Sequence, residues 1–483
     1  MEAIRSIFRE SDAFKKVNSA VKKDEYPLFI QGLTRAVIPV LTEELSEKSG
    51  TGLIVTYDDA RADKLYNDYR LYNKNVFIYP AKDVLFYYAD VHGNATARKR
   101  LEIIRRLNEK KDTIVITTVD ALMDRIPRME DIICGEIHLK LSEEIDPEEL
   151  KVKLVSLGYE NEALVESEGQ FCMRGGIIDI FPLTEDAPYR IELWGDEIAS
   201  IRSFDPETQR SIEEVSEFCV YPASEFVMSQ GRIARGLARI QDDYEKEAAA
   251  FKKTFHTEQY ARLTKAVETI REEIGEFNST TGMDSLVNYF YDDTVSFLSY
   301  FSENTGIFLD EPDKVAERAR VYATEFSMSM EARLSGGYVL SKQADVLYSE
   351  NMVLEMLSKR RLIMLSEIYA NCKCIVPAKD FHIESRGIST YGNNYNLLLE
   401  DMKKWREKGY ATVLISPSST RGRRLADNLT NEGIPAFFSQ NRERELKPRE
   451  VMVTNGNLEE GFLLDSAGLA VISESDIFSN NKV

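Results

Sequence analysis

The chain has 483 residues, too many for one compact core, because globular domains usually contain about 100–200 residues. Its hydrophobic fraction of 43% and aromatic fraction of 10% exclude a disordered or low-complexity protein. The net charge of −20 disfavours non-specific binding to nucleic acid and favours protein partners. No stretch approaches the roughly 20 apolar residues of a membrane helix, and the N-terminal segment is too polar for a signal peptide. We therefore expect a cytoplasmic protein with no membrane association.

Short apolar runs alternate with amphipathic stretches near the start of the chain, which is the βαβ rhythm of a parallel sheet. The runs that we predict as strands are residues 28–30, 53–55, 76–79 and 114–116. Residues 305–309 form another apolar run, followed by two acidic residues. We expect this run to return to the same sheet as a buried strand.

The texture of the sequence changes twice after the first α/β segment. From about 140 to 220 it becomes rich in β-hairpins, which Gly175 and Gly176 punctuate. From Ile233, apolar residues at spacings of three and four predict two long amphipathic helices packed as a hairpin.

The last hundred residues repeat the α/β rhythm and predict a second, independent α/β unit. Strands are expected at residues 412–416, 436–439, 451–454 and 469–473, and helices at 396–408 and 421–431. The second of these helices is expected to end near Gly433.

A nucleotide-binding loop would follow the first strand at Gly32, but its chemistry is missing. A working P-loop reads G-x-x-x-x-G-K-[ST], because backbone amides cradle the phosphates, the lysine reaches them and the hydroxyl holds magnesium. Here the second glycine position holds Val37, the lysine position Ile38 and the hydroxyl position Pro39. Pro39 also removes a backbone donor. The sequence therefore predicts a degenerate P-loop that binds no nucleotide cofactor.

Two other groups of residues are candidate sites. Asp310 and Glu311 resemble the acidic pair that holds magnesium in nucleotide hydrolases, but without the loop we favour solvated or helix-capping carboxylates.

No CxxC pair occurs and the histidines form no cluster with the cysteines, so we expect incidental thiols and no metal. The residues concerned are Cys134, Cys172, Cys219, Cys372, Cys374, His92, His138, His256 and His382.

Residues 169–205, GQFCMRGGIIDIFPLTEDAPYRIELWGDEIASIRSFD, carry a specific resemblance. They are similar to the hairpin domain shared by UvrB and the bacterial transcription-repair coupling factors (Mfd). The degenerate P-loop, the segment IVITTVDALMDRIP and the terminal ISESDIF resemble Mfd, because UvrB keeps a complete P-loop. UvrB also has a DNA-gripping insertion near an aromatic segment, whereas here Phe86 to Asp90 run directly into a predicted helix at 95–107. The resemblance covers nearly the whole chain.

The resemblance implies an α/β fold: a degenerate P-loop helicase-like parallel-sheet domain, an inserted β-rich hairpin domain and a small C-terminal α/β domain. The expected boundaries are 1–135 for domain 1A, 136–220 for domain 2, 221–378 for domain 1B and 379–483 for domain 3. Full-length Mfd continues into modules that bind RNA polymerase and translocate on double-stranded DNA. We expect these activities to lie outside this chain, which should be monomeric.

The resemblance places a UvrA contact on Arg174, Arg190 and Trp194. Physical reasoning favours the same residues, because period-two alternation along residues 189–194 buries Ile191 and Leu193 and exposes the others. Exposed Trp and Arg are typical of interface hot spots. The alternative is a surface arginine paired with Glu192 and a Trp194 packed on a neighbouring domain. Trp194 replaces the usual Phe of the family, which suggests a partner pocket of different depth.

Two basic segments have more ordinary explanations. We interpret the five basic residues of the predicted helix at 95–107 as a solvated helical face: Arg98, Lys99, Arg100, Arg105 and Arg106. Residues 415–424, ISPSSTRGRR, could bind phosphate where a strand enters a helix, but serine capping explains them as well.

The sequence thus predicts a non-catalytic scaffold of transcription-coupled DNA repair that recruits UvrA. The alternative from another class is a UvrB-like ATP-dependent DNA repair helicase subunit, which the missing P-loop lysine disfavours. A third possibility, a nucleotide-binding terminal unit, lacks a glycine-rich loop.

Overall fold

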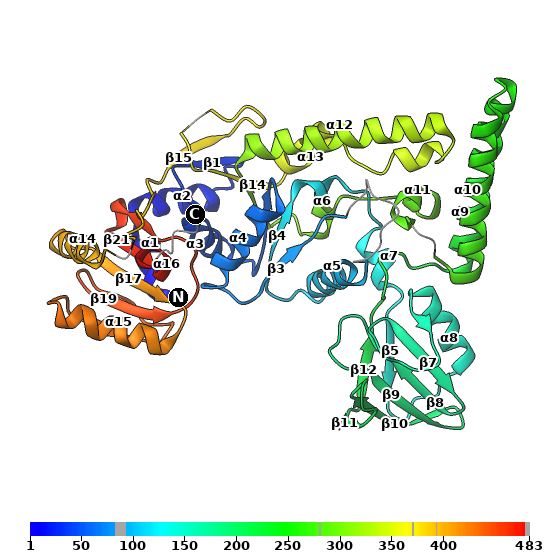
Figure 1. Cartoon of the computed structure of the whole chain (residues 1–483), viewed down its shortest axis with the longest axis horizontal. Helices are drawn as coiled ribbons and strands as arrows, with labels where there is room; N and C mark the ends of the chain where they lie inside the picture. The colour runs from blue at the N-terminus through cyan, green and yellow to red at the C-terminus, as the bar shows by residue number, and fades with distance from the viewer. Residues whose placement is uncertain (83–92, 280–281, 370, 393, 479–483) are drawn as a thin grey trace.

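The computed structural model describes residues 1–82, 93–279, 282–369, 371–392 and 394–478. Their strands form three large sheets and one two-stranded ribbon, surrounded by helices (Figure 1). The predicted α/β fold with a β-rich insertion is confirmed. None of the helices in these ranges combines the length and the apolar character that crossing a membrane requires. Residues 86–90 lie outside the described part, so the expectation that they lack the UvrB insertion stays a prediction.

The first sheet is entirely parallel, and its strands come from both ends of a long stretch of chain. Its order is β15 (Lys379–His382), β1 (Leu28–Gln31), β14 (Arg361–Ser366), β13 (Gly306–Asp310), β2 (Thr51–Thr56), β4 (Thr113–Thr118) and β3 (Val76–Tyr79). The four strands predicted near the start and the returning strand β13 are therefore confirmed.

Both faces of this sheet are buried, as is usual for parallel sheets. Alternate residues enter two separate cores: Leu28 and Ile30 face one, and Phe29 faces the other. The helices of the chain, apart from short 3-10 turns, have the following bounds: α1 (Glu2–Glu10), α2 (Asp12–Lys22), α3 (Ile38–Ser46), α4 (Asp59–Tyr69), α5 (Gly93–Asn108), α6 (Val119–Met123), α7 (Met129–Ile133), α8 (Pro147–Ser156), α9 (Gln230–Lys253), α10 (Thr257–Phe277), α11 (Val287–Phe290), α12 (Pro312–Gly336), α13 (Glu350–Ser358), α14 (Tyr395–Glu407), α15 (Ser419–Asn431) and α16 (Glu474–Ile477).

A β-rich unit hangs below the first sheet (Figure 1). Its six-stranded sheet has the order β11 (Ser211–Glu214), β10 (Glu197–Phe204), β9 (Tyr189–Trp194), β8 (Ile177–Ile180), β7 (Gln170–Arg174) and β6 (Glu160–Asn161). A ribbon of β12 (Glu217–Val220) and β5 (Ile137–Lys140) closes the unit. Helix α8 packs on the inner face, where Leu150 and Leu154 join Ile191 in one core.

The two predicted amphipathic helices are α9 and α10, and they pack as a hairpin that projects at the edge of the molecule (Figure 1). Their facing residues Ile240, Leu263, Val267 and Ile274 are buried. The periodicity of the sequence was therefore sufficient to predict this element.

The last sheet has the order β16 (Arg386–Gly387), β20 (Phe462–Leu464), β21 (Leu469–Ser473), β17 (Ala411–Ser416), β19 (Val451–Asn455) and β18 (Ala436–Phe438). The four predicted strands are present, and α14 and α15 match the two predicted helices. Strand β15, at the start of the segment expected to be domain 3, pairs with β1 of the first sheet. We therefore propose that the change between the two units falls at residues 383–385.

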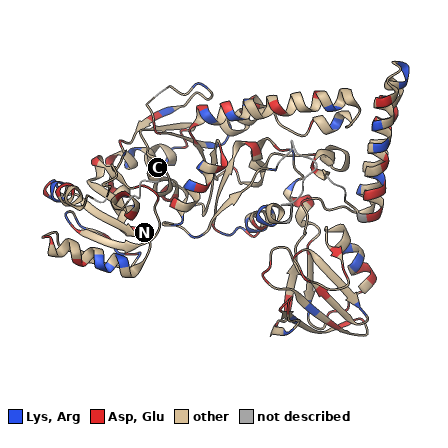
Figure 2. Ribbon diagram, viewed as in Figure 1, with Lys and Arg blue, Asp and Glu red and all other residues tan. Residues whose placement is uncertain are grey.

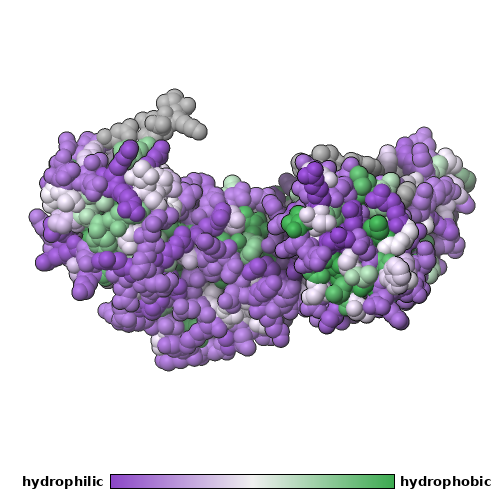
Figure 3. Space-filling model, turned by 90° about the horizontal axis from the view of Figure 1, so that it is seen from below, coloured by the Kyte–Doolittle hydropathy of each residue, from purple (hydrophilic) through white to green (hydrophobic). Residues whose placement is uncertain are grey.

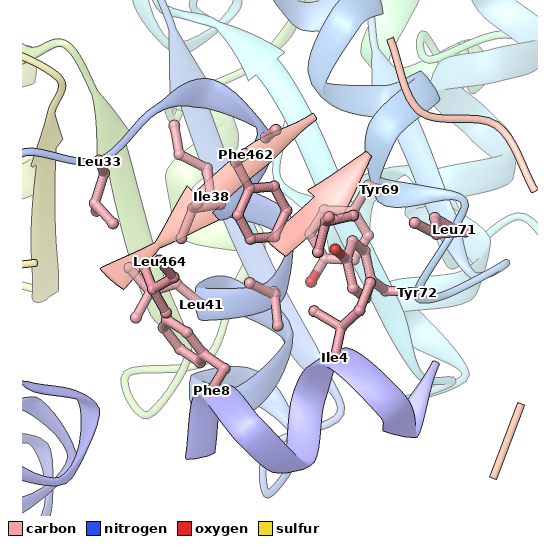
Figure 4. Packing of buried hydrophobic residues seen from close by; sticks show 14 of the residues in the cluster. Ile4, Phe8, Leu33, Ile38, Leu41, Tyr69, Leu71, Tyr72, Phe462 and Leu464 are labelled. Atoms are coloured by element: carbon pink, nitrogen blue, oxygen red, sulfur yellow. The ribbon is translucent and has the colours of Figure 1, made fainter. Parts of the chain in front are cut away.

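This last unit has its own sheet, but it is not independent in its packing. One core holds Phe462 and Leu464 of β20 together with Leu41 of α3 and Phe8 of α1 (Figure 4). All four side chains are fully buried. The second α/β sheet is present as expected, but the apolar surface that it shares with the first unit was not foreseen, because sequence periodicity identifies a buried face without showing which element covers it.

Candidate protein-binding surface

The outer face of the β-rich sheet brings the three predicted site residues onto one surface. Pairing of β7, β8 and β9 places Arg174 opposite Ile177, and Ile177 opposite Glu192. Arg190 and Trp194 are two residues to either side of Glu192 on β9, so they share its face. We call this surface the Arg–Trp face.

Asp179 on β8 holds the Arg190 side chain in place. The two residues are directly opposite each other in the sheet. Arg190 donates from Nε to Asp179 Oδ1 at 2.7 Å and from a terminal nitrogen to Oδ2 at 2.8 Å. Its guanidinium also lies 4.4 Å from the centroid of the Phe204 ring. This bidentate pair raises the pKa of Arg190 above its ordinary value and leaves only 21% of its side chain exposed.

Arg174 and Trp194 are much freer to meet a partner. Arg174 is 54% exposed and makes a longer contact of 3.6 Å with Asp179. Trp194 is 83% exposed and stands at the end of β9, just before Gly195. Gly195 has a positive φ of 65°, the left-handed conformation that a tight hairpin turn requires.

The predicted alternation along β9 is confirmed for Ile191, whereas Leu193 is only half-buried. Ile191 is fully buried and Leu193 packs partly against the same core. The alternative arrangement does not occur: Arg190 pairs with Asp179, Glu192 pairs with Arg202, and Trp194 is largely exposed. The roles of Arg174, Arg190 and Trp194 in binding stay a prediction.

Sequence reasoning missed three residues of this face. Asp179 is 1% exposed and holds the arginines, while Ile177 is 40% exposed and lies between Arg174 and Glu192. Arg202 pairs across the sheet with Arg190. The two-residue turn Gly175-Gly176 could have predicted these neighbours. It sets the register between β7 and β8 and thereby decides which residues lie opposite each other.

Seen from below, the molecule shows small groups of hydrophobic residues among hydrophilic ones (Figure 3). In the β-rich sheet the exposed large hydrophobic residues are Ile177, Trp194 and Ile212. An apolar centre bordered by charged groups is the usual composition of a protein interface.

The degenerate P-loop is filled by the chain itself. The Gly32 φ is +83°, and a side chain added there would meet the Tyr369 hydroxyl at 2.4 Å. The Thr34 amide donates to Ser385 Oγ at 2.7 Å, and Ser385 donates in turn to the Gly32 carbonyl. This backbone donor is therefore already used within the chain.

The start of α3 is equally unsuited to phosphate. Val37 and Ile38 are buried, and Pro39 lies in the first turn of the helix. The Val37 amide donates to the Thr34 carbonyl at 3.0 Å. An anion here would have to displace buried apolar side chains and would meet no lysine.

The acidic pair at the end of β13 is structural. We expected solvated or helix-capping carboxylates, and the contacts of both side chains contradict this expectation. Asp310 is fully buried and receives two hydrogen bonds from Arg61, at 2.8 and 2.9 Å, and one from Thr56. Glu311 accepts the Glu367 amide at 2.9 Å and makes no side-chain cap on α12. Both carboxylates are thus engaged inside the protein.

Lys99 is exposed as expected, but three arginines of α5 do not belong to a solvated face. Arg100 is fully buried and donates to both oxygens of Glu225, at 2.6 and 3.1 Å. Arg98 pairs with Glu168, and Arg105 pairs with Glu185 at 2.7 Å. These arginines join α5 to the β-rich unit and the segment that leaves it. Spacing on the helix could not reveal this, because the acidic partners are far away in sequence.

The alternative capping explanation for residues 415–424 is supported. Ser418 caps α15 by accepting the Arg421 amide at 3.2 Å, and Arg421 pairs with Glu474 at 3.2 Å.

Figure 2 shows basic and acidic residues interspersed on the projecting α9–α10 hairpin. Such mixed charge resembles an ordinary solvated surface more than a nucleic-acid track.

Comparison with known proteins adds independent evidence. The family described as the UvrB interaction domain matches residues 137–226. The transcription-repair-coupling factor of Bacillus subtilis (strain 168) is 27% identical over 99% of this chain, and that of Staphylococcus haemolyticus (strain JCSC1435) is 25% identical over 94%. The chain spans about 40% of the length of these relatives: 40% of the first and 38% of the second. The resemblance inferred from the sequence is thus confirmed: residues 137–226 match the UvrB interaction domain, and the chain as a whole is similar to transcription-repair-coupling factors.

Proposed function

We propose that this chain is a docking module of transcription-coupled DNA repair that recruits UvrA through the Arg–Trp face. The observation that carries the proposal is Trp194, which is 83% exposed within the matched UvrB interaction domain and lies on the same face of the sheet as two arginines that share one buried carboxylate. A large solvent-exposed aromatic side chain lowers the solubility of a free protein. Such side chains are common at the centre of protein interfaces.

We also propose that this chain has no catalytic activity of its own. Support comes from the P-loop region, where Tyr369 and Ser385 occupy the space around Gly32 and Ile38 replaces the lysine. The acidic pair that would hold magnesium is tied to Arg61 and to a backbone amide. In the whole protein, RNA polymerase binding and ATP-driven translocation on double-stranded DNA would belong to later domains. The helicase alternative requires magnesium-dependent ATP turnover by this chain.

The test measures the affinity of immobilised UvrA for the chain by surface plasmon resonance. Substitution Trp194→Ala is expected to weaken binding by about 2 kcal/mol or more, the range of interface hot spots. The matched control is Phe255→Ala, because Phe255 is equally exposed, at 87%, but lies at the tip of the α9–α10 hairpin. It should bind UvrA like the unmodified chain.

Melting temperatures of both variants should stay close to that of the unmodified chain, because exposed positions change stability by only about 0.5 kcal/mol. Equal UvrA affinity for Trp194→Ala and the unmodified chain would contradict the proposed face. Loss of binding in Phe255→Ala alone would move the contact to the hairpin.

A further inference from the structure

Two cysteines after β14 meet an aspartate at the start of α12. The sulfur atoms of Cys372 and Cys374 are 3.5 Å apart. Asp313 Oδ1 is 3.9 Å from Cys372 Sγ, although the two residues are 59 positions apart in the chain. One ligand atom from each residue lies within 4.8 Å of the other two.

We propose that Cys372, Cys374 and Asp313 form a binding site for a thiophilic divalent metal ion, of which Zn²⁺ is the commonest. Two thiolates at about 2.3 Å from one tetrahedral zinc ion lie roughly 3.8 Å apart. The 3.5 Å separation of the two sulfurs is close to this edge. Small side-chain rotations would thus suffice to bind the ion.

The surroundings orient the ligands as second-shell groups do in known metal sites. The Lys373 amide donates to Asp313 Oδ1 at 3.0 Å, which orients the carboxylate next to the two thiols. The buried thioether of Met364 lies 3.8 Å from Cys372 Sγ. A soft sulfur next to the site favours thiophilic ions over Mg²⁺ or Ca²⁺, which prefer oxygen ligands.

Both thiols are partly buried against the core behind β14. Water or an added ligand would complete the coordination. The bound ion would link the segment after β14 to the first turn of α12. This link would lie at the carboxyl ends of the strands, where β13 ends with Asp310.

The experiment uses the whole chain, reduced with a phosphine and freed of metal. Cd²⁺ is titrated as a spectroscopic probe, because thiolate ligands give it a charge-transfer band in the ultraviolet. Zn²⁺ affinity is then measured by competition with a chromogenic chelator. We expect one ion per chain and a rise in melting temperature with zinc.

Cys372→Ser or Cys374→Ser should weaken zinc binding by more than about 100-fold, since even second-shell partners are worth about 10–100-fold. Cys134→Ser is the first control, because Cys134 is an exposed thiol with no place in the cluster. Cys219→Ser is the second control and tests the other candidate group, Glu136, His138 and Cys219. Both controls should bind zinc like the unmodified chain.

X-ray absorption of the zinc-loaded unmodified chain needs no variant that might misfold. It should show two sulfur neighbours at about 2.3 Å from the metal. A shell of nitrogen and oxygen alone would overturn the proposal. So would the absence of a thiolate band with Cd²⁺, or its loss in Cys219→Ser together with its retention in Cys372→Ser.

Discussion

Asp179 receives two hydrogen bonds from Arg190 and one longer contact from Arg174, yet it is 1% exposed. The two arginines therefore differ in kind. Arg190 makes a bidentate pair with a buried carboxylate, whereas Arg174 is half exposed and can turn its guanidinium toward a partner. A bound UvrA carboxylate would gain the planar fork of Arg174 with little disturbance to the fold.

Alanine substitution should separate these two roles by their effect on stability. Arg190→Ala leaves Asp179 without its bidentate partner, so we expect a loss of about 1.5–3 kcal/mol in the free energy of unfolding, the value of charged hydrogen bonds. Arg174→Ala should change it by less than about 0.5 kcal/mol, because that side chain is half exposed. Urea unfolding measures both.

The control is the double variant Asp179→Asn, Arg190→Ala, which removes both charges and should recover part of the lost stability. Equal stability of Arg190→Ala and Arg174→Ala would contradict the structural role of Arg190. The two variants would then differ only in UvrA binding, if at all.

At the level of elements, periodicity predicted strands and helices well and their partners poorly. Residues close together in the sequence determine the alternation on β9 and the spacing of three and four in α9 and α10. Both patterns can therefore be identified from the sequence alone. The partner of Arg100 is 125 residues away, so a charged helix face looked solvated. Cys372 and Asp313 met through the pairing of β13 with β14, which no spacing rule contains.

Helix α5 is attached to the chain beyond the β-rich unit by a buried ion pair. The Arg100 side chain is 0% exposed and that of Glu225 3%. Burial alone would raise the pKa of Glu225, but Arg100 and Lys82 outweigh it and lower the value to about 2. Because this folded pKa lies below the ordinary value near 4.5, the pair stabilises the protein above about pH 4.5 and its contribution disappears as the pH falls toward 2.

Substitution Glu225→Gln should therefore be strongly destabilising at neutral pH. It removes the bidentate carboxylate partner of the buried Arg100 and leaves the longer contact of 3.8 Å with Asp124, at a cost of about 3–5 kcal/mol. The matched control is Glu168→Gln, which breaks the half-exposed pair with Arg98 and should cost less than about 1 kcal/mol. Thermal unfolding at pH 7 compares the two, and a similar small loss in both would show that the buried pair contributes little.

For the whole molecule, the important feature is the core shared by the first and last sheets. Strand β20 lies at their boundary: Leu464 points into the shared core and Leu463 into the core of the last unit. Helix α1 joins the same contact, since the Glu2 amide donates to the Arg442 carbonyl at 2.7 Å. Both sheets therefore contribute to burying the same apolar surface, and each should stabilise the other.

Native-state hydrogen exchange in the two leucine variants of β20 tests this coupling. Leu464→Ala and Leu463→Ala each remove the same atoms from a buried site and should each cost about 2–5 kcal/mol locally. Because Leu464 lies between the two sheets, its loss should reduce protection of the amides of β1 and β17 together. Leu463→Ala should reduce protection mainly in β17. If β1 kept its full protection in Leu464→Ala, the two sheets would open separately, and the last unit would be independent after all.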